Sequence, residues 1–453
     1  MTPPIAALSG DALPSVTSPL PGPRGRVLVD HLAAFECPGL TARRRRREEL
    51  SGAPHDPIVW AAARGANVVD VDGNVYVDLT AGFGAALVGH THPRVVAALR
   101  AQSERMLHAL GDVYPSDVKV ALEHRLAALA PWPARVILGL SGSDAVEAAL
   151  KTAALHTRRP GVLAFHGAYH GLSYGAVAAC GYRASFRDPF AAQLNREVRF
   201  ARYPDRDDDV GASLAASLRE VDAVLGDSRV GAVLVEPVLG RGGVVVPPDG
   251  FLAALSARTQ AAGAVLVLDE IYTGLHRTGP RFRGIAEGAA ADIVCVGKAL
   301  GGGVPVSACV MRDDVARAWG DSAGEAIHTS TFLGNPMACA AALATLDLLD
   351  GDDVRADIAR VGDGLADALA SCAQDDSLGL RGVTSVGLLL GVRLVGAGRA
   401  LAVMRALLER GYIVLPGGAA GDTLTLTPPC ALTDAQIVGF VDALRAALRE
   451  VPA

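Results

Sequence analysis

From about residue 65 onward, short apolar runs alternate with longer stretches of helical period, and this alternation restricts the fold more than any other feature. The runs include "ARVILGL", "GVLAF", "GAVLVEP", "AVLVLDE" and "DIVCVG". Apolar runs of this length, separated by helical stretches, predict strands joined by helices. Such units build a mainly parallel sheet with helices on both faces. We therefore predict an α/β fold.

Composition and pattern divide the chain of 453 residues into four segments. Residues 1–25 are rich in Pro, Ser and Gly and lack a basic start followed by an apolar block, which favours a mobile arm over a secretory signal. Residues 26–64 are expected to join the small domain, and residues 65–345 to form a large domain that binds the cofactor discussed below. Residues 346–453 are predicted to form a smaller C-terminal α+β domain.

Charge and cysteine usage limit the class of protein. The formal net charge of -6 argues against nucleic acid or an anionic membrane as the main partner. No apolar run reaches the length needed to span a bilayer. The seven cysteines are scattered without a CxxC pair, which favours a reducing cytoplasm. The run "ARRRRREEL" is better explained by a solvated helix face than by a basic binding patch.

Lysine is almost absent from this chain, and arginine supplies nearly all of its positive charge. The three lysines are Lys119, Lys151 and Lys298. Lys298 follows an apolar strand and precedes three glycines in "VGKALGGG". Arginine would serve equally well as a surface cation, whereas only lysine can lose its proton readily. A lysine retained at this place indicates chemistry that needs a neutral amine.

Polar residues gather at the predicted carboxyl ends of the strands, where α/β sheets bind ligands. Glu236 and Asp269 end two strands, and Lys298 follows a third. An amine and an acid at one sheet edge suit a carbonyl cofactor bound through nitrogen, although a structural Lys–Asp salt bridge explains the pair equally well. In "SGSDAVEAAL", the backbone N–H groups of Gly142 and Ser143 at a helix start suit a phosphate group.

The order of these motifs resembles the class III (ω-amino acid) aminotransferases. The resemblance runs from about residue 56 to 445 and rests on these segments: "DVDGNVYVDLTAGFG", "GHTHPRV", "SGSDAVEAALK", "GAYHG", "EPVLGRGG", "VLVLDEIYTGLHRTG", "VGKALGGGVPVSACV" and "TSTFLGNPMACAAALA". It implies a fold type I enzyme dependent on pyridoxal 5'-phosphate, with a mainly parallel seven-stranded sheet in the large domain. It also implies a homodimer that shares its active sites between subunits.

The resemblance implies a role for each matching residue. Lys298 matches the lysine that forms a Schiff base with the cofactor and later moves protons, and Asp269 matches the partner of the pyridine nitrogen. The other matches are expected cofactor contacts: Ser141, Gly142 and Ser143 near the phosphate, Tyr169 and Ile271 on the two ring faces, His170, Glu236 and Tyr272 around the ring, and Thr331 reaching the phosphate bound to the other subunit.

Departures from the family pattern bear on the substrate. Tyr272 stands where the family usually has Gln, and Thr425 stands near the place of an arginine that often binds a substrate carboxylate. Leu239 and Leu140 replace a usual Gln and Asn. These changes predict poor use of 4-aminobutyrate and better use of a polar carbonyl compound without a carboxylate, such as a ketosugar or a secondary-metabolite precursor. The residues expected to shape the substrate pocket are Trp60, Phe83, Tyr169, Arg241, Tyr272 and Thr425.

Other functions stay open at this stage. A racemase, epimerase or aminomutase of the same fold would use the same lysine and aspartate. The segment "GLSYG" fits the GxSxG motif of serine hydrolases, with Ser173 as the nucleophile. The histidine pairs His166/His170 and His90/His92 raise the question of a metal site, but the missing glutamate of an HExxH pattern argues against one. A regulatory role without catalysis would need a DNA-binding domain, and the sequence gives no sign of one.

Overall fold

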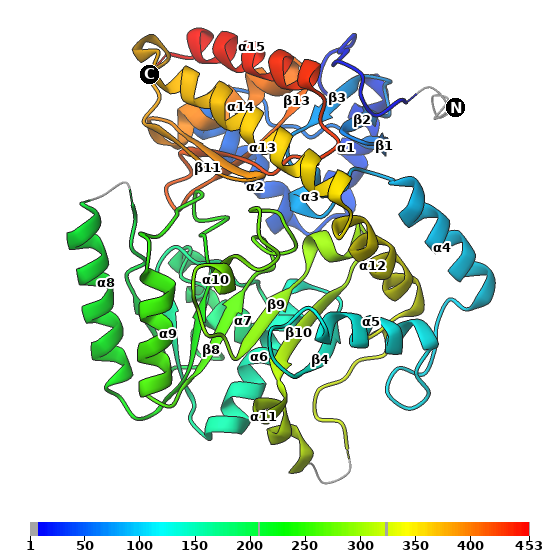
Figure 1. Ribbon diagram of the computed structural model, residues 1–453. Helices are drawn as coiled ribbons and strands as arrows, with labels where there is room; N and C mark the ends of the chain where they lie inside the picture. The colour runs from blue at the N-terminus through cyan, green and yellow to red at the C-terminus, as the bar shows by residue number, and fades with distance from the viewer. Residues whose placement is uncertain (1–7, 207–208, 322–324, 453) are drawn as a thin grey trace. The chain divides into compact units, whose positions relative to one another are not determined.

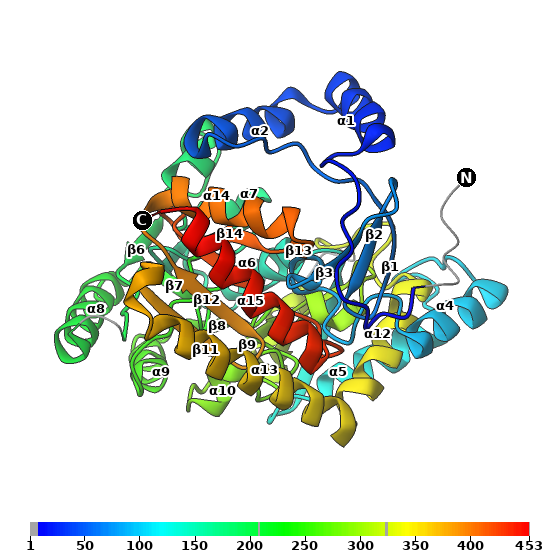
Figure 2. The ribbon, with the colours of Figure 1, turned by 90° about the horizontal axis from the view of Figure 1, so that it is seen from above.

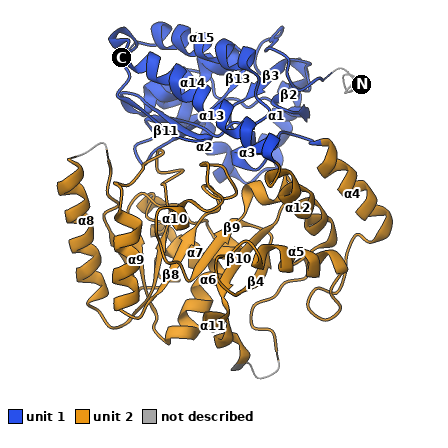
Figure 3. Cartoon of the chain, viewed as in Figure 1, with its two compact units in different colours: residues 1–92, 352–453 blue, residues 93–351 orange. Residues whose placement is uncertain are grey.

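The structure is a computed structural model that describes residues 8–206, 209–321 and 325–452. The chain forms two compact units, which are coloured separately in Figure 3. Unit 1 comprises residues 1–92 and 352–453, and unit 2 comprises residues 93–351. Within the described residues, no helix has both the length and the apolar character needed to cross a bilayer.

Unit 2 contains a seven-stranded sheet in the order β4-β10-β9-β8-β7-β5-β6 (Figure 1). Strand β10 runs in the opposite direction to the other six strands of this sheet. The sheet is therefore mainly parallel, as predicted. The strands are β4 (Ala134–Gly139), β5 (Gly161–Phe165), β6 (Val198–Ala201), β7 (Val230–Val235), β8 (Val265–Asp269), β9 (Ile293–Val296) and β10 (Ser307–Arg312).

Helices cover both faces of this sheet. The helices of unit 2 are α4 (Pro93–Arg105), α5 (Asp117–Ala127), α6 (Gly142–Thr157), α7 (Tyr174–Ala178), α8 (Val210–Leu225), α9 (Phe251–Ala261), α10 (Arg283–Ala286), α11 (Asp313–Ala316) and α12 (Pro336–Leu349). Side chains alternate between the faces of a strand. Ala164 therefore packs in the core under α6, while its neighbour Phe165 stacks edge-on against Phe251 of α9, with ring centroids 5.8 Å apart. Figure 1 shows α8 and α9 side by side at the β6 end of the sheet.

The described part of unit 1 (residues 8–92 and 352–452) contains two four-stranded sheets and five helices longer than one turn. Its helices are α1 (Pro23–Phe35), α2 (Pro38–Ser51), the single turn α3 (Ala81–Gly84), α13 (Asp352–Ala373), α14 (Gly396–Glu409) and α15 (Asp434–Glu450). One sheet has the order β1-β2-β3-β13 and the other β11-β12-β15-β14. The strands are β1 (Trp60–Arg64), β2 (Asn67–Asp70), β3 (Val75–Asp78), β11 (Gly382–Val386), β12 (Leu389–Arg393), β13 (Tyr412–Ile413), β14 (Leu415–Gly417) and β15 (Thr423–Leu426). Figure 2 shows α15 lying between α14 and α13.

The unit boundaries differ from the predicted ones. Residues 65–92 were expected in the large domain, but they belong to unit 1. Within these residues, β2 and β3 form an antiparallel hairpin around Gly73. However, β3 pairs in parallel with β13 from the C-terminal part of the chain, which draws the hairpin into unit 1. The C-terminal boundary lies after Gly351 rather than at residue 346, because α12 is one continuous helix.

The N-terminal arm is attached rather than mobile over the residues described. Residues 1–7 lie outside the described part of the chain. From there on, the Ala12 N–H donates to Asn67 Oδ1 at 2.8 Å, and the Thr17 N–H donates to Asn74 Oδ1 at 2.9 Å. Both asparagines are fully buried. Their side-chain amides supply hydrogen bonds to an extended segment that composition alone could not place. The predicted arginine-rich helix is α2, which has no buried residue.

Candidate active site

Three chemical groups meet at the carboxyl edge of the unit 2 sheet. Glu236 follows β7, Asp269 ends β8, and Lys298 follows β9 after Gly297. These three strands are consecutive neighbours in the sheet. Since parallel strands end at one edge, the chain's topology brings together residues that are up to 62 positions apart in sequence.

Lys298 is half-buried and has a strained backbone conformation. Its φ of 39° lies in the left-handed region, which residues other than glycine seldom adopt and which is found at functional sites. Its Nζ lies 4.1 Å from the centre of the Tyr272 ring. Burial lowers the pKa of Lys298, and the nearby carboxylates of Asp269 and Glu236 only partly oppose this effect. The amine is therefore easier to deprotonate than an exposed lysine.

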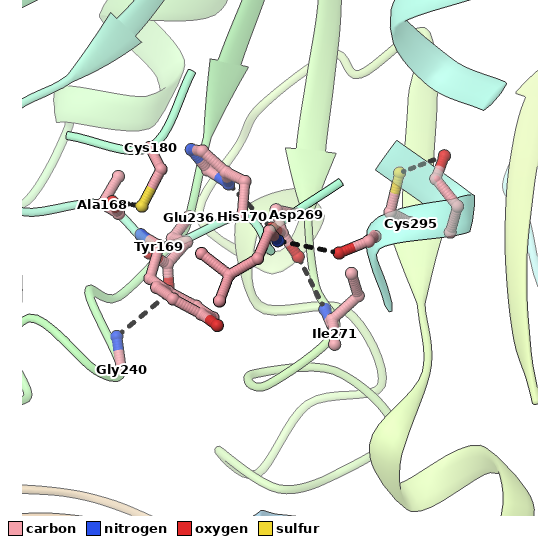
Figure 4. A network of polar contacts seen from close by, with 12 residues as sticks. Ala168, Tyr169, His170, Cys180, Glu236, Gly240, Asp269, Ile271 and Cys295 are labelled. Carbon is pink, nitrogen blue, oxygen red and sulfur yellow. Dashed lines mark hydrogen bonds and ion pairs between the residues drawn. The ribbon is translucent and has the colours of Figure 1, made fainter. Parts of the chain in front are cut away.

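Asp269 is held by two donors. Its Oδ2 lies 2.7 Å from His170 Nδ1, and its Oδ1 accepts a hydrogen bond from the Ile271 N–H at 3.1 Å (Figure 4). Both the His170 side chain and the aspartate are buried. Each oxygen therefore keeps lone pairs for a further donor. The pairing fixes the carboxylate at the strand end, and it leaves His170 Nε2 buried without a hydrogen-bond partner among the described residues.

Glu236 joins two loops of the site. Its Oε1 accepts from the Tyr169 N–H at 2.7 Å, and its Oε2 accepts from the Gly240 N–H at 3.1 Å (Figure 4). Burial raises the pKa of Glu236 above its ordinary value, and Asp269 adds to that rise. The residue thus fixes the backbone of both loops around the aromatic side chain of Tyr169.

The N-terminus of α6 offers bare backbone donors. Ser141 caps the helix, and Asp144 Oδ2 accepts the N–H groups of Leu140 and Ser141 at 2.9 and 3.0 Å. Among the described residues, the N–H groups of Gly142 and Ser143 have no such acceptor. A helix start with free N–H groups attracts an anion. The Ser143 Oγ accepts from the Leu172 N–H at 3.1 Å, which leaves its O–H able to donate to an anion.

Position 142 needs a glycine because the Ile271 side chain lies close to it, and not because of its backbone conformation. A Cβ at this position would meet Ile271 Cδ1 at 2.9 Å. The helix start and the predicted ring-packing residue Ile271 are therefore in close contact, in agreement with one common site. Gly240 has an equivalent relation to Tyr272, whose Cδ1 would lie 2.1 Å from an added Cβ.

Four further predicted residues make none of the contacts described above. Trp60, Phe83 and Thr425 belong to unit 1, where Trp60 and Phe83 are exposed and Thr425 is buried. The Thr425 Oγ1 has no hydrogen-bond partner among the described residues. Thr331 lies in unit 2 on an exposed loop before α12.

The structure gives other roles to the residues of the rival motifs. Ser173 Oγ donates to Glu147 Oε1 at 2.7 Å, and Ser173 is separated from the end of β5 by seven residues. This is not the tight strand-to-helix turn of a hydrolase nucleophile. His166 packs against Phe200, while His170 pairs with Asp269. The described part of the chain contains no group of three metal-ligand residues.

Sequence reasoning missed several residues that shape the site. Arg277 is 1 % exposed, and its charge contributes to the lowered pKa of Lys298. Glu147 reaches from α6 to the loop after His170, and Gly240 makes room for Tyr272. All three lie in or near quoted motifs, but a motif does not tell which charged residue is buried or which glycine faces a ring.

These groups fit the cofactor that the resemblance implies. Pyridoxal 5'-phosphate presents an aldehyde, a ring nitrogen and a phosphate, which require an amine, an acid and an anion site. Lys298, Asp269 and the first turn of α6 supply these at one sheet edge. Ile271 and Tyr169 supply apolar surface beside them.

Comparison with known proteins gives one consistent family. A model of the class-III aminotransferase family matches residues 51–448. An acetylornithine aminotransferase of Mycobacterium bovis is 38% identical over 398 residues, which cover 86% of this chain and 92% of that protein.

Solved structures agree with this match. A PLP-bound amine transaminase from an uncultivated Pseudomonas species has a TM-score of 0.80 at 28% identity, covering 88% of this chain and 96% of that one. The ornithine aminotransferase of Toxoplasma gondii ME49 has a TM-score of 0.77 at 29% identity, covering 87% of this chain and 91% of that one.

Proposed function

The chain belongs to the class III aminotransferase family, and we propose that it transfers the amino group of an α-amino acid to a polar carbonyl compound that lacks a carboxylate. Family membership confirms the resemblance, the aminotransferase class and pyridoxal 5'-phosphate as cofactor. The fold type I architecture with its mainly parallel seven-stranded sheet is also confirmed.

The observation that supports the catalytic assignment is that Lys298 and Asp269 lie at the ends of neighbouring strands, where the charge of Asp269 acts on the Lys298 amine. Bound pyridoxal phosphate supplies the carbonyl group and an electron-poor ring. The lowered pKa of Lys298 favours a neutral Nζ, which would take a proton from the substrate carbon and return it. Asp269 would hold a proton at the ring nitrogen, with His170 and the Ile271 N–H fixing its orientation.

The substrate proposal rests on two replacements. Thr425 stands near the place where relatives often have a carboxylate-binding arginine, and threonine cannot form a bidentate ion pair. Tyr272 stands in place of Gln and faces Lys298. Both changes disfavour a dicarboxylate as the amino acceptor and favour a neutral or hydroxyl-bearing carbonyl compound, such as a ketosugar or a secondary-metabolite precursor. Glutamate and alanine are the proposed amino donors.

We also propose a homodimer that shares its active sites. The segment 106–114 exposes Met106, Leu107, Leu110, Val113 and Tyr114, which are 41 to 69 % exposed. His108 in this segment lies 5.2 Å from the Phe332 ring, next to Thr331. An apolar surface of this kind suits a second copy of the chain. A cytoplasmic location is proposed because all seven cysteines are free thiols.

A donor and acceptor screen tests the substrate proposal. The absorbance of the bound cofactor follows the half-reaction with each donor, and the panel includes 4-aminobutyrate, acetylornithine, ornithine, glutamate, alanine and amines without a carboxylate. We expect slow reaction with 4-aminobutyrate and faster turnover with a polar, non-carboxylate acceptor. Efficient use of 4-aminobutyrate would contradict the role given to Thr425. Scrambling of an α-proton without release of an oxo product would favour a racemase instead.

A further inference from the structure

Arg241 is held by a cluster of three aromatic rings, which we call the aromatic clamp: Tyr169, Tyr182 and Phe186. Its guanidinium carbon lies 4.4 Å from the Tyr169 ring centre, 5.3 Å from that of Tyr182 and 5.7 Å from that of Phe186. The rings also pack against one another, with centroids 6.0 to 6.3 Å apart. A guanidinium on ring faces gains cation–π attraction, so the clamp orients Arg241.

The clamp positions the positive charge without neutralising it. No ion pair to Arg241 occurs within residues 8–206, 209–321 and 325–452. The nearest acid in sequence, Glu236, already accepts hydrogen bonds from the N–H groups of Tyr169 and Gly240. Arg241 is only half-buried, so its N–H groups can reach a ligand.

Arg241 is connected to the proposed reactive amine of Lys298 through Gly240 and Tyr272. It directly follows Gly240, which packs against the same Tyr272 ring that faces Lys298 Nζ. Its charge is one of those that lower the pKa of Lys298. The clamp residue Tyr169 is fixed by the Glu236 carboxylate, which ties the clamp to the site.

We infer that Arg241, oriented by the aromatic clamp, is the receptor for the carboxylate of the amino donor and of the 2-oxo acid formed from it. A guanidinium binds a carboxylate through two parallel hydrogen bonds, which gives direction as well as strength. The cofactor phosphate has its own donors at the start of α6, so the guanidinium is free for the substrate. This inference rests on the proposed function, because it identifies the binding group for the α-amino acid donor.

The test compares donors that differ only in the carboxylate. Isopropylamine is alanine with a methyl group in place of the carboxylate. In the holoenzyme, Arg241→Gln is expected to raise the half-saturating concentration of L-alanine and L-glutamate about 10- to 100-fold, as for loss of a charge-assisted hydrogen bond. The half-saturating concentration of isopropylamine should change by less than about twofold, because isopropylamine makes no such bond. Arg241→Lys should fall between Arg241→Gln and the unchanged protein, since lysine cannot bind with a planar fork.

A matched control separates charge from fold. Arg183 is exposed and lies 4.9 Å from the Tyr182 ring, so Arg183→Gln removes an equal charge from the same cluster. We expect this variant to bind both donors normally. If Arg241→Gln slowed alanine and isopropylamine equally, or changed neither, the inference would be overturned. The absorbance of the bound cofactor and the melting temperature show whether each variant keeps its fold.

A binding measurement removes any dependence on turnover. Glutarate has carboxylates but no amine, and its binding to the holoenzyme can be followed by calorimetry. We expect Arg241→Gln to lose glutarate binding and Arg183→Gln to keep it, and equal binding by all forms would contradict the inference. If alanine and glutamate both failed to react with the unchanged enzyme, the proposed donor class would fail instead, while the glutarate result would still judge Arg241.

Discussion

Lys298, Tyr272 and Gly240 form a chain of contacts in which each residue sets the position of the next. The Lys298 amine faces the ring of Tyr272, and the ring occupies the space that a side chain at position 240 would need. The position of the Tyr272 ring beside the amine therefore depends on a glycine that has no functional group. Two predictions at the scale of single residues follow from these contacts.

Substitution of Lys298 tests whether it is the reactive amine. Lys298→Ala and Lys298→Arg should both lose covalent cofactor binding and reduce turnover by about 10²- to 10⁴-fold or more, because neither offers a neutral amine. Borohydride reduction followed by peptide mapping should place the cofactor on Lys298. The two other lysines serve as internal controls, because Lys119 donates to the Gly111 carbonyl and Lys151 contacts His328. A label on either of them would refute the assignment.

Substitution of Gly240 tests whether the position of Tyr272 matters. In Gly240→Ala, the added Cβ would overlap Tyr272 Cδ1, so the ring must change its position relative to Lys298. A shift of about 1 Å at a reacting group costs on the order of 100-fold in rate. The pH profile of the cofactor absorbance should shift as well.

A double variant separates this effect from general damage. If the clash with Tyr272 is the cause, adding Gly240→Ala to Tyr272→Gln should reduce the rate little further, since the two changes act through one contact. Additive losses would contradict this. Gly382→Ala is the control, because a Cβ there meets nothing within 4 Å.

The residues proposed to react could be identified in the sequence, whereas the residues that position them could not. Lys298 and Asp269 end apolar runs, and strand ends of a parallel sheet meet at one edge. Arg277 and Glu147 carry no such signal, because a buried arginine and a tethering glutamate look like surface charges in one sequence. The contact of Gly142 with Ile271 likewise needs the three-dimensional fold.

At the scale of elements, helix α6 holds the loop that follows His170. Glu147 Oε1 accepts from the Ser173 hydroxyl and from the N–H groups of Gly175 and Ala176, at 2.7, 2.7 and 3.3 Å. One carboxylate oxygen thus satisfies the first donors of α7. This tether maintains the loop next to the Asp269–His170 pair.

Removing the tether should destabilise the protein and loosen the cofactor. We expect Glu147→Ala to lower the free energy of unfolding by about 2 kcal/mol, the scale of a lost cap with charged hydrogen bonds. Glu147→Gln keeps a carbonyl acceptor, so its free energy of unfolding should fall by less. Thermal melting and the rate of cofactor loss measure both effects. Equal behaviour of the two variants would show that the acceptor is unimportant. Ser173→Ala should retain aminotransferase activity.

Whether a segment is a helix or a strand could be predicted better than the unit to which it belongs. Helix α6 begins where the sequence predicts a helix start, because side-chain period and capping residues are local signals. The assignment of residues 65–92 to unit 1 depends on the pairing of β3 with β13, more than 300 residues away. No local pattern specifies such a partner.

At the scale of the whole molecule, assembly tests the proposed shared site. Thr331→Ala should weaken cofactor binding by about tenfold, the value of one hydrogen bond to a charged group. In mixed dimers of Thr331→Ala and Lys298→Ala subunits, one site should carry both defects and the other neither. Light scattering of the unchanged protein should give a dimer, and a fully active monomer would contradict the proposal.

The stability of the whole molecule should also depend on one buried acid outside the reaction. Glu270 is fully buried, its Oε1 accepts from the Gly284 N–H at 2.7 Å, and the Thr273 hydroxyl donates to its Oε2. Burial raises the pKa of Glu270 to about 7, from an ordinary value of 4.5. Between these values the folded state holds a proton that the unfolded state has released.

The sign of the pH dependence follows from this difference. Because the folded state binds more protons than the unfolded state, the free energy of unfolding falls as pH rises from about 4.5 to about 7, by about 3 kcal/mol in total. Glu270→Gln removes the titrating group and keeps an acceptor for Gly284. Melting temperatures of the holoenzyme should show a flatter pH profile for this variant, with its largest gain above pH 7. The exposed Glu48→Gln serves as control and should follow the unchanged protein. Parallel profiles for Glu270→Gln and the unchanged protein would show that Glu270 is ionised in the folded state throughout this range.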